Sequence, residues 1–251
     1  MLTEKQVKLS REMVKFSLKF CNACYFGNPT ADDVKVNNGT MTLVKYKGER
    51  FGITNFHVVD AYRVRLRDEP DIDFYVGNTL IDLDETLFDE DRDLDLCTFY
   101  LDGYEEEQFG SNGEIPTHFF EIDNFTSGEI KKGDFVLLGG FPGVWRSRPK
   151  SNHLIFDSLS TGSTEVTEVT SRNVRCELAL DKCVVTLNQH HNEFPENLGG
   201  LSGGPVFLNQ VLPSGISTFK LIGFIYEHIA EYDSIMVRPI SFINENFWIR
   251  R

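Results

Sequence analysis

The sequence predicts an all-β protein with one helix added at each end. Apolar residues come in short runs, and turn-forming residues such as Asn37-Asn38-Gly39 and Lys132-Gly133-Asp134 stand between them. The predicted strands include 39–46, 50–59, 96–101, 134–139, 164–170, 183–187 and 221–226. Many short strands separated by turns are typical of a β-barrel or a β-sandwich.

The two helices are expected at the ends of the chain. Residues 3–24 have apolar positions near helical spacing, and Thr3 followed by Gln6 fits a capping box. Residues 241–250 again place apolar side chains on one side, which predicts a short closing helix.

Size, charge and apolar runs restrict the class of protein. The 251 residues suffice for one large all-β domain or two ordinary ones. No run of about eighteen apolar residues occurs, and the first residues lack the apolar core of a secretory signal, so we expect a cytoplasmic protein. A net charge of −13 without a basic cluster argues against nucleic acid or an anionic membrane as a partner.

The five cysteines do not form the dense, even set of a secreted disulfide framework. Cys21 and Cys24 have the spacing of a redox pair or of half a zinc site. No second pair of this kind follows, which favours two packed thiols near a helix end. We therefore predict no metal and no cofactor.

The segment Gly199-Gly200-Leu201-Ser202-Gly203-Gly204-Pro205-Val206 carries the strongest functional signal. A nucleophilic serine needs a sharp turn that exposes its hydroxyl and directs backbone N–H groups at one point beside it, and glycine permits both. The N–H groups of Gly200 and Ser202 are the expected donors of an oxyanion hole. The alternative is a glycine-rich turn that contains an ordinary serine.

His57 is the candidate general base. It is predicted to end the apolar strand that begins near residue 50, and a base must be held at a fixed place. A lone histidine beside Phe56 and Val58 is more often a core residue. The combination is more specific, because His57 is followed by an acid before a strand and then by Ser202.

This chain order of His, Asp and Ser is that of the chymotrypsin-like architecture, and it differs from the subtilisin-like and α/β-hydrolase orders. Three segments resemble, in order, motifs of the trypsin-like serine peptidase superfamily and in particular of its HtrA-like and related bacterial intracellular branches. They are Thr54-Asn55-Phe56-His57-Val58-Val59, Gly133-Asp134-Phe135-Val136 with Gly140-Phe141-Pro142-Gly143, and Leu201-Ser202-Gly203-Gly204-Pro205-Val206.

The resemblance covers roughly residues 39–240 and implies two six-stranded antiparallel β-barrels. We expect the first barrel over about 27–110 and the second over about 128–240, with the seam between them in 103–129. Residues 1–26 are then an N-terminal helical extension to a peptidase domain that spans 27–251.

The resemblance places the acid of the triad immediately before an apolar strand. Asp95 fits, with Cys97 in a position that takes a small residue. Asp93 also fits, but it would put the carboxylate of Asp95 in that position, where burial without a partner is costly. We choose Asp95, whose expected role is to orient His57 and to stabilise the imidazolium.

An acidic stretch precedes Asp95. An EF-hand calcium loop that began at Asp89 would need glycine at its sixth position and glutamate at its twelfth, where the chain has Leu94 and Tyr100. A solvated acidic loop is the preferred interpretation, and a looser cation site is the alternative. The stretch contains Asp82, Asp84, Glu85, Asp89, Glu90, Asp91 and Asp93.

Two departures from the family bear on regulation and specificity. Leu201 stands where digestive members have an aspartate that receives a newly cut N-terminus, so activation by that ion pair is not expected. An intracellular peptidase needs restraint, and we hypothesise that a regulatory partner docks on the apolar face of residues 3–24. The alternative is that this face packs on the barrel itself.

The strand over 221–228 resembles the one that flanks the primary specificity pocket, which would bring Tyr226, Glu227 and His228 to the cleft. Glu196 stands where the floor of the pocket is expected. A buried Glu196 would favour Lys or Arg at the cleavage site, whereas a pocket-facing His228 would favour acidic residues. Of the two, we predict a preference for Lys or Arg at the cleavage site.

The sequence therefore predicts a serine endopeptidase that acts on protein or peptide substrates through an acyl-enzyme, with His57, Asp95 and Ser202 as the triad. One alternative is a catalytically silent protease fold that binds an extended peptide. Another is an acyl hydrolase for non-peptide substrates, for which the sequence offers no positive sign.

Overall fold

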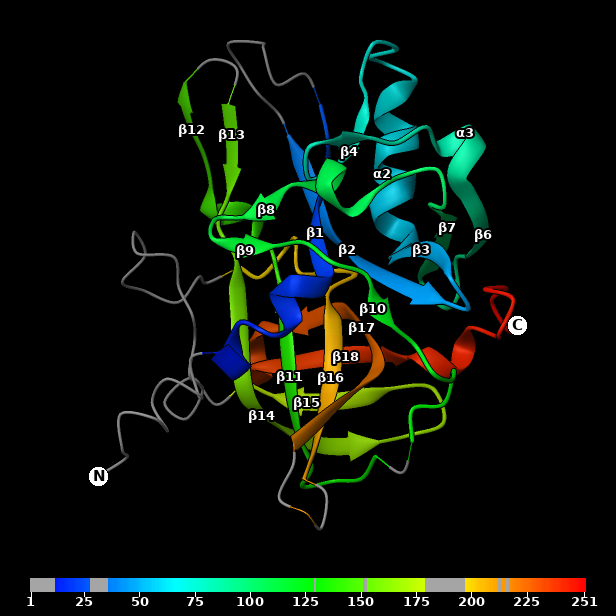
Figure 1. The fold of residues 1–251 in the computed structure, drawn as a ribbon. Coiled ribbons are helices and arrows are strands. Elements are labelled where there is room, and N and C mark those ends of the chain that lie inside the picture. The colour runs from blue at the N-terminus through cyan, green and yellow to red at the C-terminus, as the bar shows by residue number, and fades with distance from the viewer. Residues whose placement is uncertain are drawn as a thin grey trace.

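The computed structural model describes residues 12–27, 36–128, 130–150, 153–178, 197–211, 214 and 217–251. Two β-sheet bodies lie one above the other in Figure 1. We call them the upper sheet, whose strands come from residues 21–121, and the barrel, whose strands come from residues 135–239.

The upper sheet has eight strands in the order β5-β4-β1-β2-β3-β7-β6, and β10 pairs with β2 in parallel. Helix α2 (Phe56–Leu66) packs on it through Val58 and Val59. The strands are β1 (Cys21–Phe26), β2 (Asn37–Tyr46), β3 (Glu49–Thr54), β4 (Phe74–Val76), β5 (Thr79–Leu80), β6 (Leu87–Asp91), β7 (Leu96–Tyr100) and β10 (Phe120–Glu121).

The upper sheet is open within the described residues, which differs from the closed six-stranded first barrel that we expected. Its two edge strands, β5 and β6, are consecutive in the chain and are joined by the short helix α3 (Leu83–Thr86). Asp82 caps this helix by accepting hydrogen bonds from the amides of Asp84 and Glu85. A capped helical turn thus stands between the two edges, where a further strand pairing would have closed the sheet.

The barrel is closed and has six strands in the order β11-β14-β15-β18-β17-β16, as predicted for the second barrel. Its interior is filled by apolar side chains that alternate along the strands, among them Val136, Leu138, Val206 and Ile235. The strands are β11 (Phe135–Gly140), β14 (Leu159–Val169), β15 (Val174–Glu177), β16 (Pro205–Val211), β17 (Ser217–Ile229) and β18 (Ser234–Pro239).

One apolar core is shared by the two bodies. Phe207 of β16 meets Phe16 and Phe120, with ring centroids 5.1 and 4.8 Å apart and edge-to-face geometry. Phe51 of β3 belongs to the same cluster as Leu137 of β11. The two predicted β-sheet bodies are therefore present, one as a closed six-stranded barrel and one as an open sheet, and they meet along this core.

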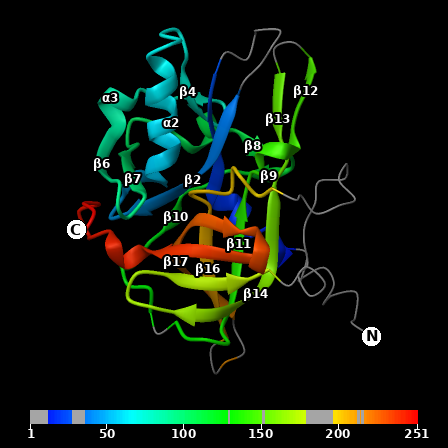
Figure 2. The same cartoon turned by 180° about the vertical axis from the view of Figure 1, so that it is seen from behind.

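The remaining elements are short. Two hairpins, β8–β9 and β12–β13, have no strand pairing with either body, and β12–β13 projects beside the upper sheet in Figures 1 and 2. Their strands are β8 (Ser111–Asn112), β9 (Ile115–Pro116), β12 (Arg146–Lys150) and β13 (His153–Phe156), and the 3-10 turns are Ser17–Phe20, Glu106–Phe109, Gly143–Trp145, Ala230–Tyr232 and Ile240–Phe242. Among the described residues, no helix is long and apolar enough to span a membrane.

The N-terminal helix predicted over 3–24 is wrong from residue 21 onward, because Cys21–Phe26 form β1. This strand is central in the upper sheet and pairs with β2 on one side and β4 on the other. Its side chains are buried on both faces, so tertiary pairing outweighs the helical spacing. Residues 1–11 lie outside the described residues, and Val14 and Leu18 are buried in the molecule's own core.

The closing helix predicted over 241–250 is also wrong. Only Ile240–Phe242 form a 3-10 turn, and the chain then folds into a tight loop closed by the bridge between Ile243 and Ile249. The side chain of Asn244 accepts hydrogen bonds from the amides of Asn246 and Trp248. Such side-chain bonds to nearby amides compete with helix formation.

Candidate active site

Ser202 lies on a sharp turn just before β16. Gly200 and Gly203 have φ values of +104° and +89°, which disfavour any residue with a Cβ. A Cβ on Gly200 would lie 2.4 Å from the carbonyl oxygen of Phe141, and one on Gly203 would lie 2.0 Å from that of Thr40. The backbone can approach β2 and the end of β11 this closely only because both residues are glycine.

The turn is fixed through its carbonyl groups. The Thr40 hydroxyl donates to the Gly200 carbonyl at 2.7 Å, and the Thr40 amide donates to the Ser202 carbonyl at 2.8 Å. The Gly143 amide donates to the Gly199 carbonyl at 2.7 Å. Sequence reasoning missed Thr40, because nothing in its strand distinguishes it from the neighbouring threonine.

Unlike these carbonyl groups, some backbone amides of the same turn are not hydrogen-bonded. Among the described residues, the N–H groups of Gly200 and Ser202 have no hydrogen-bond acceptor. The four other amides of residues 199–204 each donate to an acceptor at 2.7 to 3.1 Å, namely Asn197 Oδ1, Leu198 O, Ile225 O and Leu201 O. The two amides predicted to form an oxyanion hole are therefore available to a ligand.

His57 lies in the first turn of α2, not at the end of a strand, because β3 ends at Thr54 and Asn55 precedes the helix. The carboxylate of Asp95 explains this placement. Asp95 Oδ1 accepts the backbone N–H of His57 at 2.9 Å, which satisfies one of the amides that a helix start leaves without a partner. Asp95 Oδ2 lies 2.7 Å from Nδ1 of the same residue, so one carboxylate holds both the backbone and the ring of His57.

Asp95 is itself held in an unusual backbone conformation, with φ of +53°. Its carbonyl accepts a hydrogen bond from the buried Asn55 side chain at 2.7 Å. Two carboxylates were candidates for the acid beside His57. Asp95 is the one that contacts the His57 ring, whereas Asp93 is exposed. The His57 side chain is 51% exposed and that of Asp95 is 21% exposed, which leaves the imidazole accessible from solvent.

The two parts of the site come from different bodies that touch directly. A Cβ on Gly203 would lie 2.6 Å from Thr54 Oγ1, and Thr54 Oγ1 donates to the Thr40 carbonyl at 2.7 Å. Thr54 stands three residues before His57, and Gly203 follows Ser202. Among the described residues, no hydrogen bond joins the side chains of His57 and Ser202.

A cavity of about 220 Å³ opens beside Ser202. Tyr226, Glu227 and His228, the residues predicted to line the cleft, lie on its wall, whereas Glu196 lies outside the described residues. Burial lowers the pKa of His228 below its ordinary 6.5 and raises that of Tyr226. The remaining lining residues are Asn197, Leu198, Gly199, Leu201 and Ile225.

Leu201, the residue before Ser202, is buried in the barrel core. It therefore contributes to packing, and it offers no charge to a new N-terminus.

The described residues contain no cluster of three or more His, Cys, Asp or Glu side chains that could hold a metal ion. Cys21 and Cys24 are buried thiols on β1, and burial raises the pKa of Cys24 to about 12. A thiol with so high a pKa stays protonated at neutral pH, which agrees with the interpretation as packed thiols.

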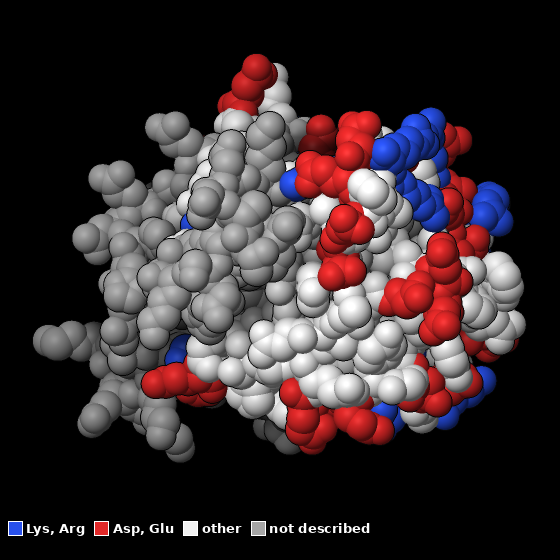
Figure 3. Space-filling view, turned by 90° about the horizontal axis from the view of Figure 1, so that it is seen from above, with Lys and Arg blue, Asp and Glu red and all other residues white. Residues whose placement is uncertain are grey.

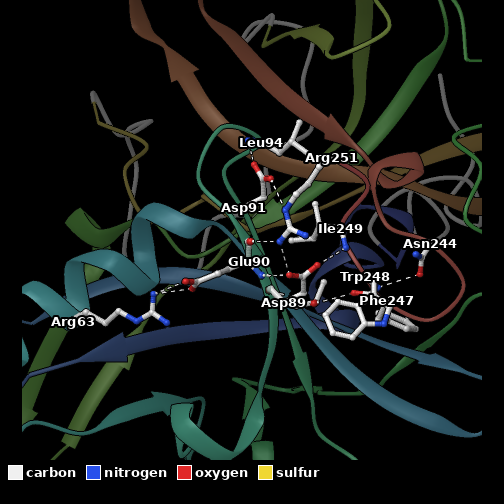
Figure 4. Close-up of polar contacts among 11 residues, drawn as sticks. Arg63, Asp89, Glu90, Asp91, Leu94, Asn244, Phe247, Trp248, Ile249 and Arg251 are labelled. Carbon is white, nitrogen blue, oxygen red and sulfur yellow. Dashed lines mark hydrogen bonds and ion pairs between the residues drawn. The ribbon is translucent and has the colours of Figure 1, made fainter.

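The acidic stretch is not the solvated loop that we expected, because it forms α3 and β6. Asp89 is only 9% exposed and binds the amide of Ile249 and the guanidinium of Arg251, both at 2.8 Å (Figure 4). Figure 3 shows acidic side chains spread over the top of the upper sheet, with fewer basic ones among them.

No protein-family model matches the sequence, and no curated protein is similar to it. One similar solved structure is the active form of the Rv3671c protease from M. tuberculosis, with 14% sequence identity and a TM-score of 0.43 over 90% of this chain and 78% of that chain. Values this low do not transfer an activity or a site from that protein.

Proposed function

We propose that the protein is a serine endopeptidase that acts through an acyl-enzyme. The observation that carries the proposal is the turn at Ser202, where only the amides of Gly200 and Ser202 are without an acceptor in the described part of the chain. An oxyanion that formed at this point could accept hydrogen bonds from both amides without competition from another acceptor in the described residues. The Asp95–His57 pair on the neighbouring body supplies an oriented base.

In the proposed reaction, Ser202 Oγ attacks the peptide carbonyl while His57 Nε2 takes the hydroxyl proton. Asp95 keeps Nδ1 protonated and stabilises the imidazolium. His57 then returns the proton to the leaving amine, and the acyl group stays on Ser202. A water molecule, deprotonated by His57, releases the acid product and regenerates the serine.

The cavity beside Ser202 is the proposed site for the side chain that precedes the cleaved bond. Glu227 on its wall supports a preference for Lys or Arg, as does the proposed role of Glu196. His228 favours acidic side chains only when it is charged, and its lowered pKa works against that at neutral pH.

A second candidate function is a peptide-binding module without catalysis. The observation in its favour is that the Ser202 and His57 side chains are not hydrogen-bonded to each other in the described residues. Catalytic hydrogen bonds often tighten only when substrate is bound, so this geometry does not remove the peptidase candidate.

A serine-reactive fluorophosphonate distinguishes the two candidates. We expect a single adduct on the wild-type protein, detected by intact mass, and none on Ser202→Ala or His57→Ala. Ser111→Ala is the matched control, because Ser111 is exposed and binds only the nearby Gly113 carbonyl. A folded wild-type protein that forms no adduct but binds peptides saturably would establish the binding module instead.

We also propose that residues 1–11 are the docking element for a regulatory partner, in place of the whole segment 3–24. Val14 and Leu18 are buried, so the apolar face from residue 12 onward is already occupied. A protein lacking residues 1–11 tests this role, and unchanged labelling, regulation and solubility would contradict it.

A further inference from the structure

Arg238 of β18 is a charged residue buried where the two bodies meet, with 6% of its surface exposed. A buried guanidinium is costly unless its donors are satisfied. Here Nε donates to the Leu94 carbonyl at 2.7 Å, and Nη1 donates to the Arg172 carbonyl at 2.9 Å and to Asn173 Oδ1 at 2.7 Å. The barrel thus uses one side chain to hold a turn of the upper sheet.

That turn presents Asp95 to His57. Leu94 directly precedes Asp95, and both of its backbone groups are held: its carbonyl by Arg238 and its amide by Asp91 Oδ1 at 2.8 Å. Figure 4 shows Leu94 and Asp91 together, with Arg251 beside Asp91. Because Asp95 has a positive φ, it depends on such support to keep this conformation.

The same guanidinium also supports the cavity. Its Cζ lies over the ring of Tyr226, 4.4 Å from the ring centroid. Tyr226 falls at a bulge, since Ile225 pairs with Val237 and Glu227 pairs with Met236, so strand pairing alone does not fix it. One side chain therefore contacts both the turn that carries Asp95 and the cavity wall beside Ser202.

We propose that Arg238 is a positioning residue that acts through Asp95 and keeps the Asp95–His57 pair in register with the cavity beside Ser202. This inference rests on the proposed peptidase function. Lysine is a poor substitute, because an ammonium group cannot reproduce a planar fork that reaches three acceptors and also stacks on an aromatic ring.

A double-mutant cycle tests the proposal, with the maximal rate of fluorophosphonate labelling as the readout. We expect Arg238→Lys to lower this rate about 10- to 100-fold, as displacement of a positioned group does. In an Asp95→Asn background, Arg238→Lys should change the labelling rate less than about twofold, because the effects of two substitutions are not additive when one residue acts through the other. Equal effects in both backgrounds, or no effect in either, would overturn the proposal.

Arg50→Lys is the matched control. Arg50 also donates to a backbone carbonyl, that of Tyr104 at 2.7 Å, and lies over an aromatic ring, that of Phe119, but it does so away from Ser202. Its labelling rate should equal that of the wild type. Thermal unfolding of every variant identifies any loss of folded protein. If Arg238→Lys does not fold, Asn173→Ala replaces it in the double-mutant cycle, because this change removes one hydrogen-bond acceptor of the Arg238 guanidinium. The same outcomes then support or overturn the proposal.

A spectroscopic readout separates failure of this inference from failure of the proposed function. A proton on Nδ1, in the 2.7 Å contact between His57 and Asp95, is expected to give a far-downfield resonance whether or not Ser202 reacts. We expect its exchange with solvent to be faster in Arg238→Lys than in the wild type and in Arg50→Lys. If the wild type does not label yet this exchange still responds to Arg238, the positioning role stands without catalysis. Unchanged exchange would overturn the positioning role.

Discussion

Asp95 links backbone structure to chemistry at the level of a single residue. Its two carboxylate oxygens bind the amide and the ring of His57, so the group that would orient the base also starts the helix that carries it. Thr40 has a comparable role on the opposite side, since its hydroxyl and its amide both fix the turn that bears Ser202. Each half of the candidate site thus has one residue that sets its geometry.

Gly200→Ala should lower the labelling rate of the protein that remains folded, a fraction that thermal unfolding measures separately. The added Cβ would meet the Phe141 carbonyl and Asn38, which forces the Gly200 amide away from its direction. Loss of one oxyanion donor lowers a rate by about 10² to 10³. Gly48→Ala is the control, because Gly48 has a similar φ of +92° but open space around it. Equal labelling by both variants would contradict the oxyanion role.

His228 should make the choice of substrate depend on pH. Burial keeps its pKa below the ordinary 6.5, so the ring is neutral at pH 7 and gains charge only as the pH falls further. The charged ring would attract acidic and repel basic side chains, and the ratio of cleavage after Lys to cleavage after Glu should fall by about two- to fivefold in acid. Above about pH 5.5 both substrate side chains keep their charge, so a ratio compared between about pH 5.5 and 7.5 cancels pH effects common to both substrates, and His228→Gln should give a constant ratio over that range. A pH-dependent ratio in that variant would rule out His228 as the cause.

At the scale of elements, β1 differs most from expectation. The spacing of apolar residues from Val14 to Cys21 predicts a helix that continues to residue 24, but the chain turns into a strand at Cys21. Local spacing cannot distinguish the two for so short a segment, because a strand buried on both faces is apolar at every position.

Deletion of residues 1–25 should therefore prevent folding of the upper sheet. It removes all but one residue of β1, a strand with a partner on each side, together with the buried Val14 and Leu18. Circular dichroism and thermal unfolding measure the outcome. Leu18→Ala serves as a graded comparison and should lower the free energy of unfolding by about 2–5 kcal/mol. A deletion variant with a full cooperative transition would mean that β1 is dispensable.

At the scale of the whole molecule, the segment 243–251 returns to the strand that leads toward Asp95. Asp89 of β6 binds the Ile249 amide and Arg251, and Thr98 of β7 donates to the Phe247 carbonyl at 3.0 Å. The C-terminal segment thus binds both β6 and β7, the two strands that flank the turn that carries Asp95.

Asp89→Ala should release this contact and lower the free energy of unfolding by about 1–3 kcal/mol, since a buried amide loses its charged acceptor. Asp93→Ala is the matched control, because Asp93 is exposed. Denaturant unfolding of the two variants and the wild type measures the difference. Equal stability of all three would show that the contact contributes nothing.

The sequence by itself determined the mostly β class, parts of the barrel strands β11, β14 and β17, and the turn at Ser202, because glycine-rich turns and alternating apolar residues are local signals. The predicted strand over 183–187 lies outside the described residues. It also identified Asp95 as the carboxylate beside His57, through the cost of burying a second charge.

Only the tertiary structure decided that β1 is a strand, that His57 lies in the first turn of a helix, that the upper sheet is open within the described residues, and that Thr40 and Arg238 support the site. Each of these depends on a partner distant in the chain, such as β4 for β1, Asp95 for His57 or Leu94 for Arg238. Such pairings leave no regular spacing in the sequence, since the free energy that selects them arises only when the two segments meet.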